Sequence, residues 1–293
     1  MVACGKVGTE LAGRGGGAGC VNPRLKCETW APRQPMAIGR RKRLIAWPEM
    51  SDPILLKIQR AQKHIDELKV VLKSFKDSGP YSVSRKRDSK TGEWLIYIAD
   101  AKPIPHDVEL ISGDIVQNLY CCLDYLAWEM VKAAGMKKPN SFTSFPISEE
   151  VPTTDKQIDR YNRQVDGMSE DAKRAIECMR PYRRENNRFW TLHKLNNLNK
   201  HRTLLTIGFA SSKISGPAEL MIRADIARHR PLEKGSILLR STPDSVNHQQ
   251  TQFLFDVALN EPEADCYARP LLLTMLECYS LVYRTVQSLS EYR

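Results

Sequence analysis

The sequence predicts an α+β fold, a helical bundle of long amphipathic helices with a small, mainly antiparallel β-sheet. Apolar residues recur at alternating spacings of three and four near both ends of the chain's body, as helices that bury one face require. Segments rich in β-forming residues come in runs between those helices, which favours α+β over a doubly wound sheet. With 293 residues, of which 42% are hydrophobic, the chain is long enough to bury one large core.

Residues 1–50 differ from the rest in composition and form a basic, glycine-rich tail. They hold nine basic and three acidic side chains, and so contribute six of the formal net charge of +10. No apolar period runs through them, and we predict disorder because the segment cannot bury enough apolar surface. The basic run 40–43 suits a nucleic-acid arm or a targeting signal. The favoured interpretation is a gene-start error, with translation beginning at Met36 or Met50.

The body, residues 51–293, is predicted to be a single domain with a long helix at each end. Ser51 or Asp52 caps the first helix, Pro53 suits its first turn, and it ends at about Asp77. Its apolar seam consists of Ile54, Ile58, Ala61, Ile65, Leu68, Leu72 and Phe75. A second seam lies on the final helix, at about 269–291. We expect these two helices to pack together, or to join two copies of the chain in a homo-oligomer.

Between these helices the sequence predicts a hairpin, a second long helix, shorter helices and several strands. The hairpin joins two β-rich segments through a polar turn, and Gly135 ends the second long helix. The expected ranges are strands 81–87 and 94–100, helices 107–134, 155–165, 169–179 and 186–201, and strands 204–210, 219–224, 236–240 and 252–259. A loop is expected between Pro262 and Pro270.

Several common chemistries lack their usual sequence signals. The five cysteines of the body form no C-x-x-C pair and no zinc-ligand spacing, so we expect no metal site. Glycine-rich nucleotide-binding motifs and common hydrolase motifs are missing from the sequence, and no cofactor is expected. No window of about 18 apolar residues predicts a membrane span. An odd number of cysteines in the body, without a signal peptide, points to the reducing cytoplasm.

The predicted helix around residues 188–202 carries an unusual set of polar side chains. Asparagine disfavours helix interiors and usually has a hydrogen-bonding reason to be there. His201 and Arg202 lie near the helix C-terminus, where the dipole favours cations. We take Asn197, Lys200, His201 and Arg202 as candidate binding residues.

Asp124 is a further candidate binding residue, because it interrupts the most apolar helical segment of the chain. A carboxylate there is either exposed or buried and paired, since burial without a partner is unfavourable. We predict that Asp124 contacts His201 or Arg202, as a structural ion pair in preference to a catalytic dyad.

Four motifs resemble a family of uncharacterised bacterial proteins. They are Leu-Asp-Tyr-Leu-Ala-Trp at 123–128, Phe-Pro-Ile at 145–147, Arg-Pro-Tyr at 180–182 and Leu-Asn-Asn-Leu-Asn-Lys-His-Arg at 195–202. The resemblance covers about residues 107–205. This chain departs from the family's pattern at Tyr125, where His is usual, and at Asn199, where Asp is usual. The resemblance implies no activity, and any chemistry of that His or Asp would be missing from this member.

Two classes of function fit the sequence. The first is a non-enzymatic binding or assembly protein built on the two apolar seams. The second is a nucleic-acid-binding protein, because the basic strip from Arg180 to Arg202 is interleaved with Phe189 and Trp190, which suit base stacking.

The same strip carries a spacing that resembles the Arg-x4–6-His motif of the HEPN ribonucleases. Arg188 and His193 fit that spacing, although Phe189 stands where a polar residue usually follows the arginine. Under this alternative, Arg188, His193 and His201 are the candidate catalytic residues.

Overall fold

The computed structural model describes residues 52–135, 138–201, 204–205, 207–215, 232–241 and 252–293. The chain divides into two compact units, Met1–Ile45 and Ala46–Arg293, and the first lies wholly outside the described residues. The predicted disordered tail 1–50 and the predicted strand 219–224 also fall outside them.

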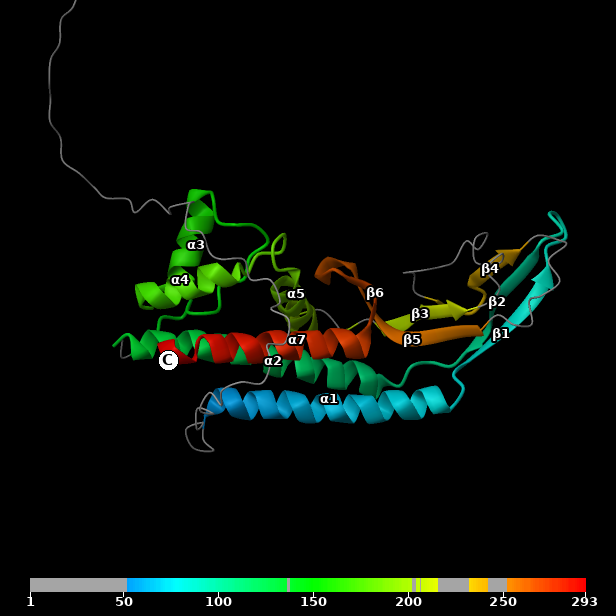
Figure 1. The fold of residues 1–293 in the computed structure, drawn as a ribbon, viewed down its shortest axis with the longest axis horizontal. Coiled ribbons are helices and arrows are strands. Elements are labelled where there is room, and N and C mark those ends of the chain that lie inside the picture. The colour runs from blue at the N-terminus through cyan, green and yellow to red at the C-terminus, as the bar shows by residue number, and fades with distance from the viewer. Residues whose placement is uncertain (1–51, 136–137, 202–203, 206, 216–231, 242–251) are drawn as a thin grey trace, which may run out of the picture. The chain divides into compact units, whose positions relative to one another are not determined.

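The described part of the chain has an α+β fold, as predicted, with six α-helices and two three-stranded antiparallel sheets (Figure 1). The helices are α1 (Pro53–Asp77), α2 (His106–Ala133), α3 (Asp155–Val165), α4 (Glu170–Met179), α5 (Asn187–His201) and α7 (Leu271–Ser288). The strands are β1 (Tyr81–Arg87), β2 (Trp94–Ala101), β3 (Ile207–Ser215), β4 (Ile237–Ser241), β5 (Gln252–Glu261) and β6 (Cys266–Pro270). One sheet has the order β1-β2-β4 and the other the order β3-β5-β6.

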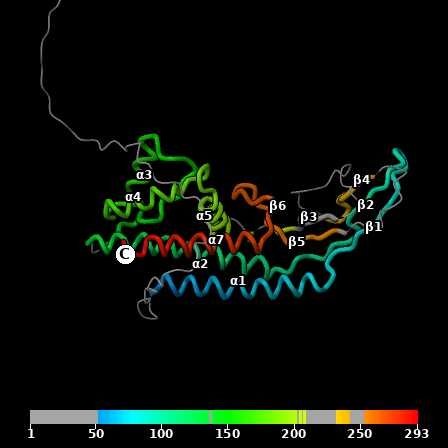
Figure 2. The backbone as a smooth tube through the Cα atoms, viewed as in Figure 1, coloured from blue at the N-terminus to red at the C-terminus, as the bar shows by residue number. Residues whose placement is uncertain are grey.

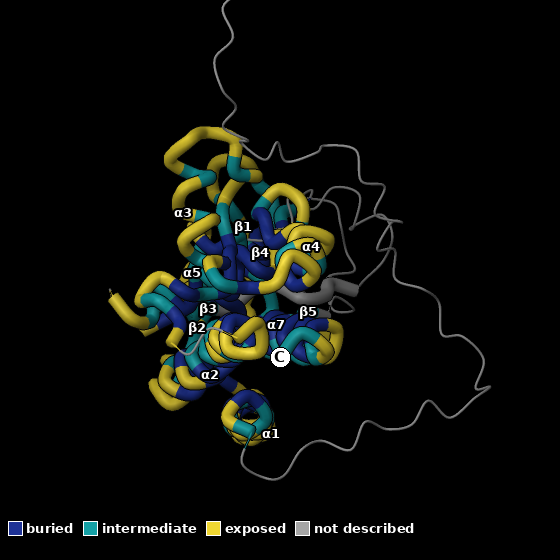
Figure 3. The backbone as a smooth tube through the Cα atoms, turned by 90° about the vertical axis from the view of Figure 1, so that its left-hand side faces the viewer, coloured by how far each residue is buried: buried dark blue, intermediate teal, exposed yellow. Residues whose placement is uncertain are grey.

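The three long helices α1, α2 and α7 lie side by side and contact one another (Figure 2). Their apolar stripes form one core with α5, and Figure 3 shows the buried segments in dark blue. The predicted seam of α1 is buried from Ile54 to Phe75. The contact between the first and last helices is confirmed, although α2 is the more extensive neighbour of α1. None of the helices in this part of the chain has the length and apolarity of a membrane span.

The apolar seams of α1 and α7 are therefore buried within one chain. A homo-oligomer through these helices would have to use their outer faces. Those faces carry the exposed side chains of Leu56 and Val70 on α1 and of Leu273 and Leu276 on α7.

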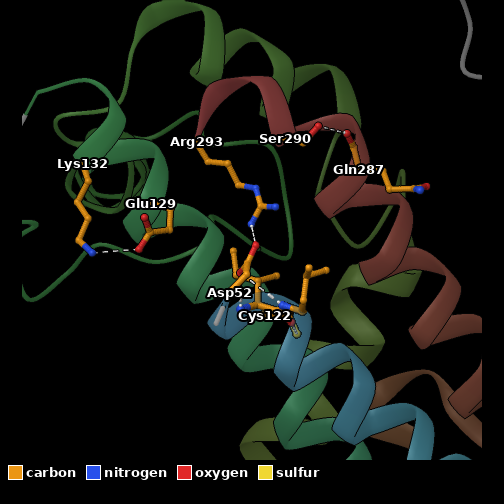
Figure 4. Close-up of polar contacts among 9 residues, drawn as sticks. Asp52, Cys122, Glu129, Lys132, Gln287, Ser290 and Arg293 are labelled. Atoms are coloured by element: carbon orange, nitrogen blue, oxygen red, sulfur yellow. Dashed lines mark hydrogen bonds and ion pairs between the residues drawn. The ribbon is translucent and has the colours of Figure 1, made fainter. Parts of the chain in front are cut away.

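An ion pair joins the start of α1 to the last residue of the sequence, as Figure 4 shows. Asp52 caps α1 as predicted, because its Oδ1 accepts a hydrogen bond of 2.9 Å from the Ile54 N–H. Its other oxygen, Oδ2, accepts one of 2.7 Å from Nη1 of Arg293. Each of these two side chains is only 12% exposed.

The β-structure differs from the prediction in three respects. The strands form two sheets instead of one, and β3 begins at Ile207, later than the predicted residue 204. The loop predicted over 262–270 is wrong in its second half, where β6 pairs with β5. A short 3-10 turn at Pro262–Ala264 and a left-handed Asp265, with φ of 56°, return the chain onto β5. Residues 266–270 resembled a loop in the sequence, because they are few and end in a proline, which is rare inside strands.

Candidate functional site

Helices α2 and α5 approach each other closely where Gly113 faces Asn199. The Asn199 side chain donates a hydrogen bond of 3.4 Å from Nδ2 to the Gly113 carbonyl. A Cβ atom at position 113 would lie 2.4 Å from Oδ1 of Asn199. Gly113 therefore allows the two helices to approach each other. The hydrogen bond to its carbonyl explains why an asparagine occupies position 199, inside a helix that asparagine otherwise disfavours.

Both ring nitrogens of His193 have hydrogen-bond partners, and the one at Nδ1 links α5 to α2. Nε2 accepts a hydrogen bond of 3.0 Å from Nδ2 of Asn197, one turn further along α5. Nδ1 lies 3.1 Å from Oη of Tyr120 on α2. With the Asn197 amide in this orientation, the imidazole proton sits on Nδ1 and is donated to the tyrosine oxygen. Burial first, and then the nearby cations, lower the pKa of His193 from 6.5 to about 4, so the ring is neutral at pH 7.

Tyr120 is held as a neutral phenol beside this imidazole. Burial and the Asp124 carboxylate both raise its pKa above 10. Because its oxygen accepts the His193 proton, its own hydroxyl proton must point away from the imidazole. Among the described residues, none accepts a hydrogen bond from that hydroxyl.

Asp124 holds the Phe-Pro-Ile loop against α2. Its Oδ1 accepts a hydrogen bond of 3.3 Å from the Phe145 N–H. Burial raises the pKa of Asp124 to about 6, while this hydrogen bond and Lys200 act in the opposite direction. Among the described residues, Asp124 has Phe145 and not His201 as its hydrogen-bond partner. The predicted contact with Arg202 stays a prediction, because Arg202 lies outside the described residues.

Three of the four motifs that carry the family resemblance contact one another near Phe145, and Phe189, which precedes the fourth motif on α5, packs against it. The Phe145 ring stacks on Phe189 of α5, with ring centroids 5.4 Å apart. Ser148, just after the Phe-Pro-Ile motif, forms a parallel bridge with Tyr182 of the Arg-Pro-Tyr turn. Asp124 completes the cluster, so segments far apart in the sequence support one side of α5.

Three cations from α3 and α5 lie near enough to His193 to act on its pKa. Nζ of Lys200 lies 5.6 Å from the centroid of the Tyr120 ring, and Nζ of Lys194 lies 4.8 Å from that of Trp190. Arg160 of α3 and both lysines act electrostatically on His193 and lower its pKa. Within the part of the chain that the structure describes, Arg160, Lys194 and Lys200 form no ion pair with a carboxylate.

The arginines of the basic strip lie in a different environment, because each is paired with a carboxylate of the fold. The pairs are Arg180 with Glu185, Arg183 with Asp265 and Glu149, Arg184 with Glu150, and Arg188 with Glu277. Phe189 and Trp190 are buried, so neither presents a face on which a base could stack. These pairings weaken the interpretation of the strip as a nucleic-acid surface.

Arg188 and His193, the residues with the ribonuclease-like spacing, have different neighbours. Arg188 lies 4.0 Å from Glu277 of α7, whereas His193 contacts Tyr120 of α2. Since both nitrogens of His193 already have partners, the ring is poorly suited to proton transfer with a substrate.

An open groove of about 320 Å³ borders this cluster. It is lined by Lys194, Asn197, Leu198, His201 and Glu263. Two of the predicted binding residues, Asn197 and His201, therefore share one groove wall. Asn197 also contacts the imidazole, so it connects the groove to the hydrogen-bonded pair of His193 and Tyr120.

No group of three or more His, Cys, Asp or Glu side chains among the described residues could hold a metal ion. The three buried thiols, Cys122, Cys266 and Cys278, have pKa values raised by burial and are core residues.

Two members of the cluster were not identified from the sequence. Tyr120 lies four residues before Asp124 on α2, and this spacing is the signal that could have pointed to it. Arg160 comes from α3, and no local pattern connects it with α5.

A scan against protein-family models, a search of curated proteins and a search of solved structures each found no match to this chain. The geometry of the site is therefore the basis on which a function is inferred.

Proposed function

We propose that the protein is a non-enzymatic binding protein for a small anion. The site is the cluster around His193, formed by Arg160 of α3, Tyr120 of α2, and Lys194 and Lys200 of α5. The observation that carries this proposal is the contrast in charge pairing. These three cations form no ion pair in the described part of the chain, while four arginines of the neighbouring strip do.

Two hydrogen-bond donors of the same cluster, the Tyr120 hydroxyl and the Trp190 indole N–H, could donate to an anion. When the His193 proton is on Nδ1, the Tyr120 hydroxyl has no acceptor in the described part of the chain. The indole Nε1 of Trp190 is buried and has none there either. Trp190 packs beside His193, with ring centroids 5.8 Å apart. An anion would satisfy such donors and balance the cations at once.

Two features favour binding over catalysis. The neutral imidazole of His193 is held at both nitrogens. The buried thiols of Cys122, Cys266 and Cys278 have raised pKa values and are therefore poor nucleophiles.

Isothermal titration of the full chain with inorganic phosphate, sulfate, acetate and citrate tests this proposal. Arg160→Gln and Lys200→Gln should each weaken binding of the preferred anion about tenfold. Lys156→Gln removes a charge from the same helix as Arg160, and Arg184→Gln removes one that is already paired. Both controls should bind like the wild type.

Failure of the wild type to bind any of these anions would overturn the proposal, as would equal losses in the controls. Binding of single-stranded RNA that Arg184→Gln weakens would favour the nucleic-acid alternative instead.

We also infer that the chain is a cytoplasmic member of the bacterial family that its motifs resemble. Contacts among three of those motifs near Phe145 support the family assignment. The five described cysteines are all free thiols, which agrees with a reducing compartment. A homo-oligomer through helices 53–77 and 269–291 stays a prediction, which sizing chromatography of the full chain tests.

A further inference from the structure

The relay Tyr120–His193–Asn197 fixes the direction of one proton beside the proposed anion site. Asn197 can present either a donor or an acceptor, and here its Nδ2 donates to Nε2 of His193. The imidazole therefore carries its proton on Nδ1, which lies 3.1 Å from the Tyr120 oxygen. That oxygen then acts as an acceptor toward His193, and its hydroxyl proton is free for another partner.

The surroundings of Tyr120 make an oxyanion the suitable partner. Lys200 lies over its ring, with Nζ 5.6 Å from the ring centroid. Arg160 also acts electrostatically on the phenol, while Asp124 and Cys121 of its own helix have the opposite effect. Burial keeps the phenol protonated, so it remains a donor throughout the physiological pH range.

We infer that the Tyr120 hydroxyl is the hydrogen-bond donor that recognises the bound oxyanion, and that His193 and Asn197 are positioning residues that orient its proton. This inference rests on the proposed anion-binding function. It assigns to the buried imidazole a role that requires neither charge nor proton transfer. It also explains why His193 and Asn197, one helical turn apart on α5, contact each other.

Nitrogen-15 NMR of His193 tests the relay without any ligand. Wild-type protein should show the tautomer with the proton on Nδ1. Asn197→Asp replaces the donor by a carboxylate that can only accept, so the proton should move to Nε2. The Tyr120 hydroxyl would then donate to Nδ1 and no longer face the anion. A wild-type imidazole protonated on Nε2 would overturn the inference and leave the anion site itself untouched.

Titration with inorganic phosphate and with acetate tests the recognition step. Tyr120→Phe and Asn197→Asp should each weaken the preferred anion about tenfold, the usual effect of losing one hydrogen bond to a charged group. Asn199→Asp is the matched control for the added negative charge, because it lies two residues further along α5 and outside the relay. It should lower affinity clearly less than Asn197→Asp.

Unchanged affinity of Tyr120→Phe, in a protein that still binds the anion through Arg160 and Lys200, would contradict the role of Tyr120. A wild type that binds neither anion would instead refute the proposed function. A preference for phosphate over acetate, or the reverse, identifies which oxyanion the hydroxyl recognises.

Discussion

At the residue scale, Asp124 and His193 are both partly buried. Burial raises the pKa of Asp124 and lowers the pKa of His193, because it disfavours the charged form of each. Asp124 rises from 3.8 to about 6, so the folded chain holds its proton more tightly than the unfolded chain does. His193 falls from 6.5 to about 4, so the unfolded chain holds that proton more tightly. As pH rises from 4 to 6, the first group lowers the free energy of unfolding and the second raises it. The two effects largely cancel in the wild type.

Replacing either group should expose the pH dependence of the other. Asp124→Asn should gain stability relative to wild type as pH rises from 4 to 7, by at most about 3 kcal/mol. His193→Gln should lose stability relative to wild type over the same range, by a similar amount. Urea unfolding at a series of pH values measures both differences. A difference from wild type that does not vary with pH would contradict the pKa shift of the residue replaced.

The sequence pointed to several residues of the site but not to their partners. Asp124 was identifiable because a carboxylate within an apolar helical segment is unusual, and His193 because of its spacing from Arg188. Their hydrogen-bond partners, Phe145 and Tyr120, belong to other segments of the chain. Such pairings depend on how helices pack, and periodicity within one helix carries no information about them.

At the element scale, the crossing of α2 and α5 depends on a glycine inside a helix. Alanine is favoured over glycine in helices by about 1 kcal/mol, so Gly113 needs a compensating reason. The reason is Asn199, whose Oδ1 occupies the space that a Cβ would fill.

A double-mutant cycle measures this contact. Gly113→Ala should stabilise an Asn199→Ala background by about 0.5–1 kcal/mol, through helix propensity. In the wild-type background the same change should be less favourable by about 1 kcal/mol, because Asn199 must move and lose its hydrogen bond. Thermal unfolding of the four proteins gives both values. Equal effects in the two backgrounds would show that the contact does not restrict position 113.

Elements with a long apolar period were predictable, whereas the short strand β6 was not. The seam of α1, together with the N-cap and Pro53 at its start, predicted its extent from Pro53 to Asp77. β6 has only five residues, and it forms a strand because β5 provides partners for it. Tertiary pairing of this kind overrides the local preference of a segment that ends in Pro270.

At the scale of the whole molecule, the ion pair between Asp52 and Arg293 connects two ends of the described fold. Asp52→Asn keeps an oxygen that can cap α1 but removes the charge, and Arg293→Met keeps most of the apolar stem. The double-mutant cycle of these changes should give a coupling of about 1–3 kcal/mol, since both side chains are 12% exposed. Chemical denaturation measures it.

The control is the surface pair of Glu129 and Lys132, whose side chains are 42% and 49% exposed. Its coupling should stay below about 0.5 kcal/mol. An Asp52–Arg293 coupling no larger than that of Glu129 and Lys132 would show that the buried pair does not stabilise the fold.

The central position of α2 between α1 and α7 has a consequence for the order of synthesis. The ribosome makes α1 and α2 early, and they can pair at once because they are close in sequence. α7 is made after every other α-helix of the described fold, and until then the apolar surface that it covers faces water. Nascent chains that pause before Leu271 should therefore be the form most dependent on chaperones and most prone to aggregate.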